Sequence, residues 1–292
     1  MIQQFQPIVL SHPNGATATL CLYGAHVTSW KLADGEEKFF LSEQAKFQEG
    51  KSIRGGVPII FPQFNEFGSG SRHGFARTSA WALLSAPTQN GDRIECELSL
   101  VHSDETKKIW PHNFSARYLV SLGENSLTLR LKIQNTGEAP FDFTAALHSY
   151  FKISALNNIS LTGLKQKEYW NNDGSEFSHR NTENETELII PDAIDRVYFD
   201  VEGSLSLSDA HALENDGKEC DQIKKNNLKI NQLGFSDTVV WNPGEKAVLG
   251  MSDMVKEEYQ NMLCVEAAAI DRPVVLNPDE TWVGSQNLEV NL

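Results

Sequence analysis

The segment 125–137, NSLTLRLKIQNTG, indicates the fold class more clearly than any other part of the chain. Polar and apolar residues alternate through it, the apolar ones being Leu127, Leu129, Leu131 and Ile133. Successive side chains of a β-strand point to opposite faces of its sheet, so this period of two predicts a strand with one buried face. The segment 93–101, RIECELSLV, shows the same alternation and predicts a second strand of this kind.

Strand-like segments recur on both sides of this stretch. The segment 116–122, ARYLVSL, comes just before it, and the Gly-Glu-Asn turn at 123–125 lies between the two, so we expect a hairpin. Further strands are predicted at 18–22, 26–32, 197–201, 204–208 and 238–241. Asp-Gly and Asn-Gly pairs supply turn residues between such segments.

Helix is scarce, and the best candidate is a short one at 253–262 with acidic residues early in it. No linker, low-complexity segment or clear repeat interrupts the pattern. We therefore predict an all-β protein with little helix: one large domain of antiparallel sheets, sandwich-like, over residues 1–292.

Charge and composition limit the function. The 292 residues carry a formal net charge of -14, with 40% hydrophobic and 22% charged residues. Nucleic acids and anionic membranes need a basic face, so neither is expected as a partner, and any anion site must be local. The N-terminus does not resemble a signal peptide, and no apolar run is long enough to span a membrane. The four cysteines are far apart, so we expect a cytoplasmic protein with reduced thiols.

A local anion site is suggested by the segment 51–77, KSIRGGVPIIFPQFNEFGSGSRHGFAR. It contains the arginines Arg54, Arg72 and Arg77, together with His73 and five glycines. Glycines let the backbone turn sharply and approach a ligand closely. Guanidinium groups on such a loop suit a phosphate, although arginines in an acidic chain also form structural ion pairs.

Two residues in apolar surroundings are candidates for acid–base chemistry. His148 lies in TAALHSYF and Glu266 in NMLCVEAAA. A lone histidine in such a run is more often a core residue bonded to backbone, and a lone buried carboxylate is often held in a structural hydrogen bond or ion pair. Burial also raises the pKa of a carboxyl group, which suits a general base.

Nucleotide and metal sites are not indicated by the spacing of residues. The glycines form neither GxGxxG nor a GKS/T motif. The eight histidines are scattered without an HxH or HExxH pair, so we expect no metal and no cofactor.

The chain resembles the glucose-6-phosphate 1-epimerases, or hexose-6-phosphate mutarotases, of the aldose 1-epimerase superfamily. Seven segments carry the resemblance in family order: SIRGGVPIIFPQF, HGFAR, IWPHNF, FTAALHSYF, IDRVYFD, VVWNP and MLCVEAA. The resemblance covers nearly the whole chain and implies a galactose-mutarotase-like β-supersandwich.

The resemblance also implies roles at the reacting end of the substrate. Mutarotation opens a cyclic hemiacetal and closes it on the other face. His148 matches the family's catalytic histidine, which gives a proton to the ring oxygen, and Glu266 matches its catalytic glutamate, which takes one from O1. His73 resembles a position that assists by hydrogen bonding, its alternative being a histidine that stabilises a turn.

At the other end of the substrate, Arg54 and Arg77 match phosphate-binding arginines of the family. Asp195 matches a position that binds sugar hydroxyls; the alternative interpretation of Asp195 is a carboxylate at a turn or a strand end. The chain departs from the family pattern at Arg72, which is either a third phosphate ligand or solvated, and at residues 267–268, where Ala-Ala replaces the Pro-Gly of many relatives.

The expected function is therefore the interconversion of the anomers of hexose 6-phosphates, most of all glucose 6-phosphate, by a monomer or weak homodimer. Two alternatives stay open: a mutarotase of unphosphorylated aldoses, for which the arginine loop would be unnecessary, and a non-catalytic sugar-phosphate-binding protein, for which an acid–base pair would be unnecessary.

Overall fold

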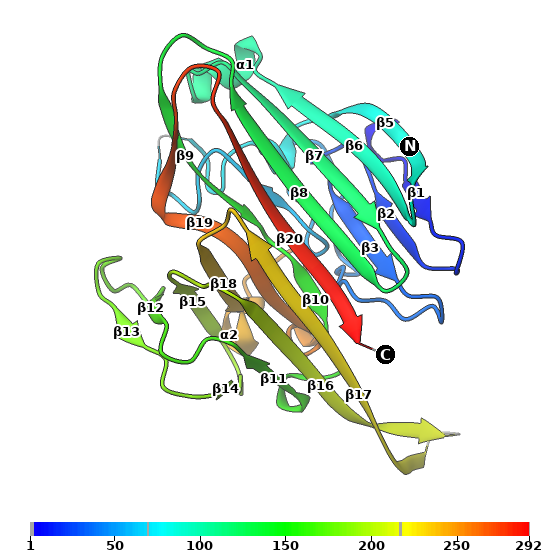
Figure 1. Ribbon diagram of the computed structural model, residues 1–292. Coiled ribbons are helices and arrows are strands. Elements are labelled where there is room, and N and C mark those ends of the chain that lie inside the picture. Colours follow the sequence, from blue (N-terminus) through cyan, green and yellow to red (C-terminus); the bar gives the residue numbers. More distant parts are fainter. Residues whose placement is uncertain (1–2, 69, 216–217, 292) are drawn as a thin grey trace.

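The computed structural model describes residues 3–68, 70–215 and 218–291. Two large β-sheets pack against each other, and a small three-stranded sheet adjoins them at the N-terminal end of the chain (Figure 1). Within the described residues, all pairs of the named strands are antiparallel. The predicted all-β class with antiparallel sheets is confirmed.

The larger sheet has nine strands, in the spatial order β14 (Glu187–Leu188), β11 (Ile159–Thr162), β16 (Ser204–Asn215), β17 (Lys218–Leu233), β20 (Thr281–Asn291), β8 (Ser126–Asn135), β7 (Phe114–Leu122), β6 (Arg93–Val101) and β5 (Ala82–Asn90).

The second sheet has eight strands, in the order β13 (Asn181–Thr182), β12 (Glu168–Asn171), β15 (Ile194–Tyr198), β18 (Asp237–Asn242), β19 (Met262–Leu276), β9 (Phe141–Leu147) and β4 (Ile59–Ile60), with β10 (Tyr150–Lys152) also paired to β19. The small sheet consists of β1 (Ile8–Ser11), β2 (Thr17–Leu20) and β3 (Val27–Lys31).

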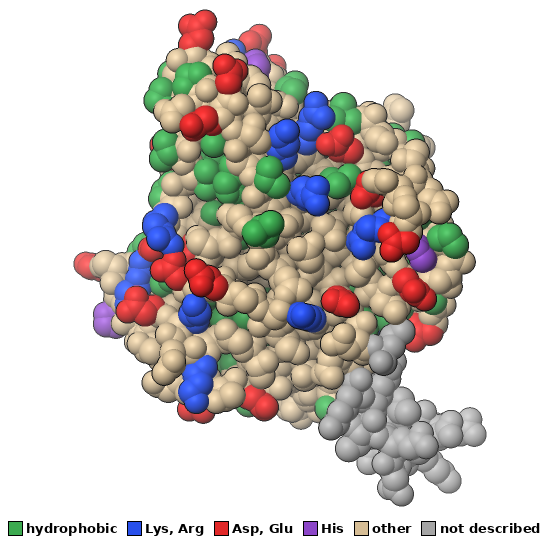
Figure 2. All heavy atoms as spheres, viewed as in Figure 1, with side chains coloured by type: hydrophobic (Ala, Val, Ile, Leu, Met, Phe, Trp, Pro, Cys, Tyr) green, Lys and Arg blue, Asp and Glu red, His purple; other side chains and the backbone are tan. Residues whose placement is uncertain are grey.

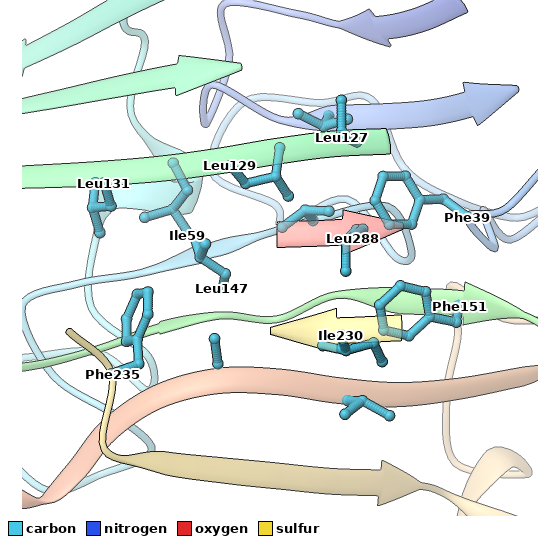
Figure 3. Close-up of a cluster of buried hydrophobic side chains, with 14 of the residues drawn as sticks. Phe39, Ile59, Leu127, Leu129, Leu131, Leu147, Phe151, Ile230, Phe235 and Leu288 are labelled. Carbon is cyan, nitrogen blue, oxygen red and sulfur yellow. The ribbon is translucent and has the colours of Figure 1, made fainter. Parts of the chain in front are cut away.

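The alternating segment forms the centre of the nine-stranded sheet. Strands β7 and β8 make the predicted hairpin, with Leu122 opposite Leu127. The apolar residues of β8 are fully buried, and they point towards side chains of the other sheet such as Ile59 and Leu147 (Figure 3). The main core therefore lies between the two sheets.

In the part of the chain that the structure describes, helix is limited to short segments. Two α-helices, α1 (Asp104–Ile109) and α2 (Gly244–Val248), were not predicted, although Ser103 is a favourable N-cap residue and forms a capping box with Thr106 in α1. The candidate at 253–262 forms a 3-10 helix at Lys256–Asn261 instead. The other 3-10 helices among the described residues are Gln3–Phe5, Ala76–Thr78 and Leu156–Asn158.

Most predicted strands begin and end within a few residues of an observed strand. The predicted strand 197–201 is wrong in its bounds, because the observed strand β15 spans Ile194–Tyr198. Strand β15 ends at Tyr198, and the left-handed conformations of Asp200 (φ 49) and Gly203 (φ 96) then turn the chain into β16. The correction matters because it places Asp195 inside a strand.

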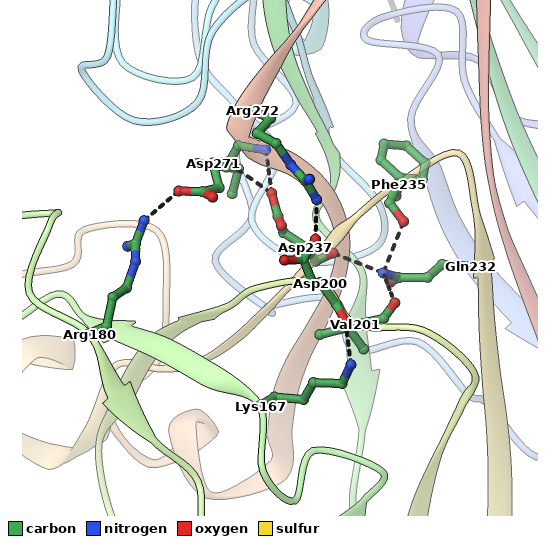
Figure 4. Close-up of polar contacts among 10 residues, drawn as sticks. Lys167, Arg180, Asp200, Val201, Gln232, Phe235, Asp237, Asp271 and Arg272 are labelled. Carbon is green, nitrogen blue, oxygen red and sulfur yellow. Dashed lines mark hydrogen bonds and ion pairs between the residues drawn. The ribbon is translucent and has the colours of Figure 1, made fainter.

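Strand β19 bends where its pairing with β9 is interrupted, between Ala269 and Val274. Buried Asp237 accepts hydrogen bonds there from the backbone N–H groups of Ile270 (2.7 Å) and Asp271 (2.9 Å), as Figure 4 shows. These bonds satisfy backbone donors that the sheet leaves unpaired, so Asp237 stabilises the bend.

The described surface carries mixed charge. On the face in Figure 2, Lys and Arg side chains are interspersed with acidic ones. None of the helices in the described residues is long and apolar enough to cross a membrane. Cys21, Cys96 and Cys264 are free buried thiols, and the side chain of Cys220 lies outside the described part.

Candidate active site

The register of the eight-stranded sheet brings His148 and Glu266 together. Leu147 stands opposite Ala267, and Tyr150 stands opposite Cys264, so the residues between them face each other across the strands. Nδ1 of His148 lies 3.1 Å from Oε1 of Glu266, and both side chains are buried. The alternative interpretation of His148 was a core histidine whose ring bonds to the backbone. Such a contact is made by His26, whose Nε2 lies 2.9 Å from the carbonyl oxygen of Gly55.

Burial disfavours charge on both members of this pair. It lowers the pKa of His148 well below its usual value, and His73 and the nearby arginines act in the same direction. Burial raises the pKa of Glu266 well above its usual value, helped by the neighbouring carboxylate of Asp195. The discharged pair, a neutral imidazole beside a protonated carboxyl group, is therefore favoured before substrate binds.

Asp195 comes to the pocket from β15, which β18 separates from β19, and it stands opposite Trp241 of β18. Its Oδ2 accepts a hydrogen bond of 2.9 Å from the side-chain amide of Asn172. Burial raises the pKa of Asp195 to about 6. Asp195 is the second residue of β15, so it lies near the strand end, and its side chain lines the pocket.

The arginine loop borders the same pocket, a cavity of about 510 Å³, which is the size of a small-molecule site. Among the residues that line it are all seven predicted site residues, Arg54, Arg72, His73, Arg77, His148, Asp195 and Glu266.

Arg54 and Arg77 differ in how they are held. Arg54 donates to the hydroxyl of Tyr150 at 2.9 Å and forms an ion pair of 3.3 Å with Asp253, so a structural ion pair does exist there. Arg77 donates to the backbone carbonyl of Arg72, and within the described residues no ion pair of Arg77 with a carboxylate is found. Burial lowers the pKa of Arg77 to about 10, so the group stays cationic at neutral pH.

Glycine is required where the loop passes close to other backbone. Gly74 has φ 68, and a Cβ there would lie 2.1 Å from the carbonyl oxygen of Phe61. The preceding residue, His73, also has positive φ, and its Nδ1 accepts a hydrogen bond of 3.2 Å from the backbone N–H of Asn65. This bond leaves the proton of neutral His73 on Nε2, so the histidine both stabilises the loop and lines the pocket.

Sequence reasoning missed several residues of the site. Trp241, Asn172 and Tyr150 line it or support it, and Asp253 pairs with Arg54. Tyr150 and Trp241 lie in segments that were singled out, two residues after His148 and within VVWNP, but nothing in the pattern distinguished them from core aromatics.

Buried Gln286 of β20 connects the strands that carry the acid–base pair. Its Oε1 accepts a hydrogen bond of 2.6 Å from the hydroxyl of Ser149, and its Nε2 donates to the carbonyl of Val265 at 3.0 Å. Ser149 follows His148 and Val265 precedes Glu266, so one side chain of the nine-stranded sheet fixes the spacing behind the pair.

The variant Gln286→Leu should leave the hydroxyl of Ser149 and the carbonyl of Val265 buried without partners. Each unpaired group costs about 1–3 kcal/mol, so the free energy of unfolding should fall by about 2–6 kcal/mol. Urea denaturation measures this, with Gln89→Leu on the exposed strand β5 as a control that changes stability by less than about 0.5 kcal/mol. Wild-type stability of Gln286→Leu would show that the bridge contributes nothing.

One cluster in the pocket has the residue types of a metal site. Ligand atoms of His148, Cys264 and Glu266 lie within 4.8 Å of one another. The sequence-spacing argument could not anticipate this cluster, because its members are far apart in the chain. Arg54, Arg72 and Arg77 line the same pocket, and their positive charges oppose the entry of a divalent cation.

The fold and the pocket define a structural class: a galactose-mutarotase-like sandwich with a histidine–glutamate pair in one sheet and arginines beside it. Residues 6–289 match the family described as "Aldose 1-epimerase". The chain belongs to the aldose 1-epimerase family, and it is an epimerase, an enzyme of the isomerase class.

Relatives and a solved structure agree with this assignment. The chain is 36% identical over 286 residues to a "Putative glucose-6-phosphate 1-epimerase" of Cenchrus ciliaris, covering 96% of this chain and 83% of that protein. It is 31% identical over 269 residues to a protein of the same name from Escherichia coli K12, covering 91% and 84%. The crystal structure of a "putative mutarotase" from Salmonella typhimurium superposes with a TM-score of 0.82 at 27% identity, over 97% and 89% of the two chains.

Proposed function

We propose that this epimerase interconverts the α and β anomers of hexose 6-phosphates, with glucose 6-phosphate as the preferred substrate. The observation that carries the proposal is a single pocket that joins the His148–Glu266 pair to Arg77 and Arg54. The names of the relatives from Cenchrus ciliaris and Escherichia coli support the phosphorylated substrate.

Ring opening needs one proton transfer at each of two oxygens. In the complex, His148 as imidazolium gives its proton to the ring oxygen, and Glu266 as carboxylate takes the proton of the C1 hydroxyl. The C1–O5 bond breaks, and an open-chain aldehyde results. Rotation about C1–C2 presents the other face of the carbonyl. As O5 attacks C1 and the ring closes, His148 takes its proton back from the O5 hydroxyl and Glu266 returns its proton to O1.

Burial of the pair favours this reaction. The opening step discharges His148 and Glu266 together, and the shifted pKa values of both residues favour their discharged forms. The charged forms needed at the start gain hydrogen bonds with the sugar, because imidazolium donates to the ring oxygen and carboxylate accepts from the C1 hydroxyl. His148 and Glu266 exchange acid and base roles in each turnover. A small free-energy difference between the charged and the discharged form of the pair therefore suits catalysis in both directions.

The phosphate is recognised away from the reacting atoms. Arg77 is half-buried and positively charged, and Arg54 presents a guanidinium group held by Tyr150 and Asp253. Forked guanidinium donors suit phosphate oxygens. Arg72, which is exposed on the same pocket, adds a third positive charge, and Asp195 accepts hydrogen bonds from sugar hydroxyls.

Polarimetry tests the activity directly. Freshly dissolved α-glucose 6-phosphate relaxes towards its anomeric equilibrium, and the purified protein should accelerate this relaxation in proportion to its concentration. A relaxation rate unaffected by the protein would refute the proposed function.

Removal of metal ions is expected to leave the activity unchanged. The proposed proton transfers need only His148 and Glu266. Cys264 lies close to both and could complete a metal site with them, so the expectation needs a test. The relaxation rate should be the same before and after dialysis against a strong chelator. Activity that is lost on dialysis and restored by Zn²⁺ would instead assign the cluster a metal-assisted mechanism.

A further inference from the structure

The side chain of Tyr150 contacts both ends of the pocket. It lies two residues after His148, at the start of β10, and it is buried. Its hydroxyl accepts the hydrogen bond of 2.9 Å from Nη1 of Arg54. Its ring stacks on the imidazole of His148, with ring centroids 4.7 Å apart and an angle of 11° between the planes.

Other aromatic residues hold the tyrosine ring in place. Phe40 stacks with it at 6.4 Å, and Trp241 lies edge-on to it at 5.9 Å. Trp241 is also edge-on to His148, at 5.8 Å and 87°. A ring enclosed in this way has little freedom to rotate, so its hydroxyl and its face are presented in a fixed relation to each other.

Arg54 depends on this hydroxyl for its orientation. Its other amino nitrogen, Nη2, lies 3.3 Å from Asp253, so the guanidinium is held from two sides by groups on β10 and on the loop before the 3-10 helix Lys256–Asn261. If the hydroxyl is removed, the carboxylate of Asp253 remains as the side-chain partner and can draw the guanidinium away from a bound phosphate.

We propose that Tyr150 is a positioning residue for both halves of the active site: its hydroxyl orients the phosphate-binding Arg54, and its ring holds the imidazole of His148 in the geometry for proton transfer. The first half rests on the proposed function, since it presumes that Arg54 binds the 6-phosphate. The second half requires only the acid–base reaction.

Two variants separate the roles. Tyr150→Phe keeps the ring and removes the hydroxyl, so KM for glucose 6-phosphate should rise about 3–10-fold, the effect of losing one hydrogen bond, while kcat stays within about twofold. Constants for free glucose should not change. Tyr150→Leu also removes the stacked ring, and kcat for both sugars should fall by about 10–100-fold, because a small displacement of a catalytic group has effects of this size.

The control is Tyr118→Phe, which removes the hydroxyl of an equally buried tyrosine on β7 of the other sheet. All four kinetic constants of this variant should match the wild type. Circular dichroism and thermal unfolding establish that each variant is folded, and Tyr150→Phe, nearly isosteric, decides the question of the hydroxyl even if Tyr150→Leu does not fold.

The possible outcomes are distinct. If Arg77→Ala raises KM for glucose 6-phosphate but Tyr150→Phe does not, the arginine half of the proposal is wrong although the proposed function stands. If Tyr150→Phe lowers kcat for both sugars as much as Tyr150→Leu does, the hydroxyl is not selective for the phosphate end, and the division of roles is wrong. If the wild type does not distinguish the two sugars, the proposed substrate is refuted and the arginine half with it. Turnover of glucose by Tyr150→Leu still decides the histidine half.

Discussion

The variant Glu266→Gln is expected to remain folded and to lower kcat for glucose 6-phosphate by about 10²–10⁴-fold, the usual contribution of a positioned general base. Glutamine has nearly the same shape as glutamate but cannot accept a proton from the C1 hydroxyl. His148→Ala should cause a loss in the same range, because the ring oxygen then lacks its acid. Steady-state kinetics of anomer relaxation measures both.

Glu183→Gln provides a matched control. Glu183 is also a buried glutamate, but it is bonded to Arg196 and Tyr198, away from the acid–base pair. Its replacement should affect stability more than turnover. Wild-type turnover by folded Glu266→Gln would show that the base has been assigned to the wrong residue.

The variant Arg77→Ala is expected to raise KM for glucose 6-phosphate by about 10–150-fold, since a hydrogen bond to a charged group contributes about 1.5–3 kcal/mol. The phosphate is remote from C1, so its contacts stabilise the ground state and the transition state about equally, and kcat should change less than KM. Kinetics with glucose 6-phosphate and free glucose measure the difference.

Free glucose serves as the internal control, because its weak turnover should hardly change in Arg77→Ala. Arg117→Ala, on β7 of the other sheet, removes a half-exposed arginine and should change neither constant. Sulfate should compete with glucose 6-phosphate in the wild type and much less in Arg77→Ala. Equal losses for both sugars would mean that Arg77 shapes the site instead of binding phosphate, and would favour a general aldose mutarotase.

The fold class could be predicted from the sequence because its signal is local. The alternation of Leu127, Leu129 and Leu131 with polar residues indicates a strand with one buried face, and this pattern can be recognised without knowing the rest of the fold. Strand ends were less predictable. The segment 197–201 contains apolar residues that pack in the core, yet Asp200 leaves the strand conformation, and residue types alone did not show this.

The site residues were found individually from residue type and from family resemblance, but their arrangement was not predictable. The contact between His148 and Glu266 depends on the register of β9 and β10 against β19, which residues far apart in the sequence determine. The same holds for Gln286 of the opposite sheet. Its hydrogen bonds to Ser149 and Val265, which are next to the pair in the chain, could not be predicted from a local sequence pattern.

The side chains that hold Arg54 could not be predicted from the sequence either. Local sequence could suggest that Arg54 binds an anion or forms an ion pair, but not that Asp253 and Tyr150 would hold it at the edge of the pocket. Long-range contacts of this kind decide how a charged side chain is oriented, and they form only when the sheets are assembled.

Anomer exchange followed by NMR tests the central claim, recognition of a 6-phosphate by a mutarotase site, most directly. Magnetisation transfer between the α and β C1 protons gives the catalysed exchange rate for glucose 6-phosphate, galactose 6-phosphate and free glucose under one set of conditions. We expect kcat/KM for glucose 6-phosphate to exceed that for free glucose by at least about tenfold, the minimum effect of one charge-assisted hydrogen bond to the phosphate. Equal values for the phosphorylated and free sugars, or faster exchange of free glucose, would contradict the account.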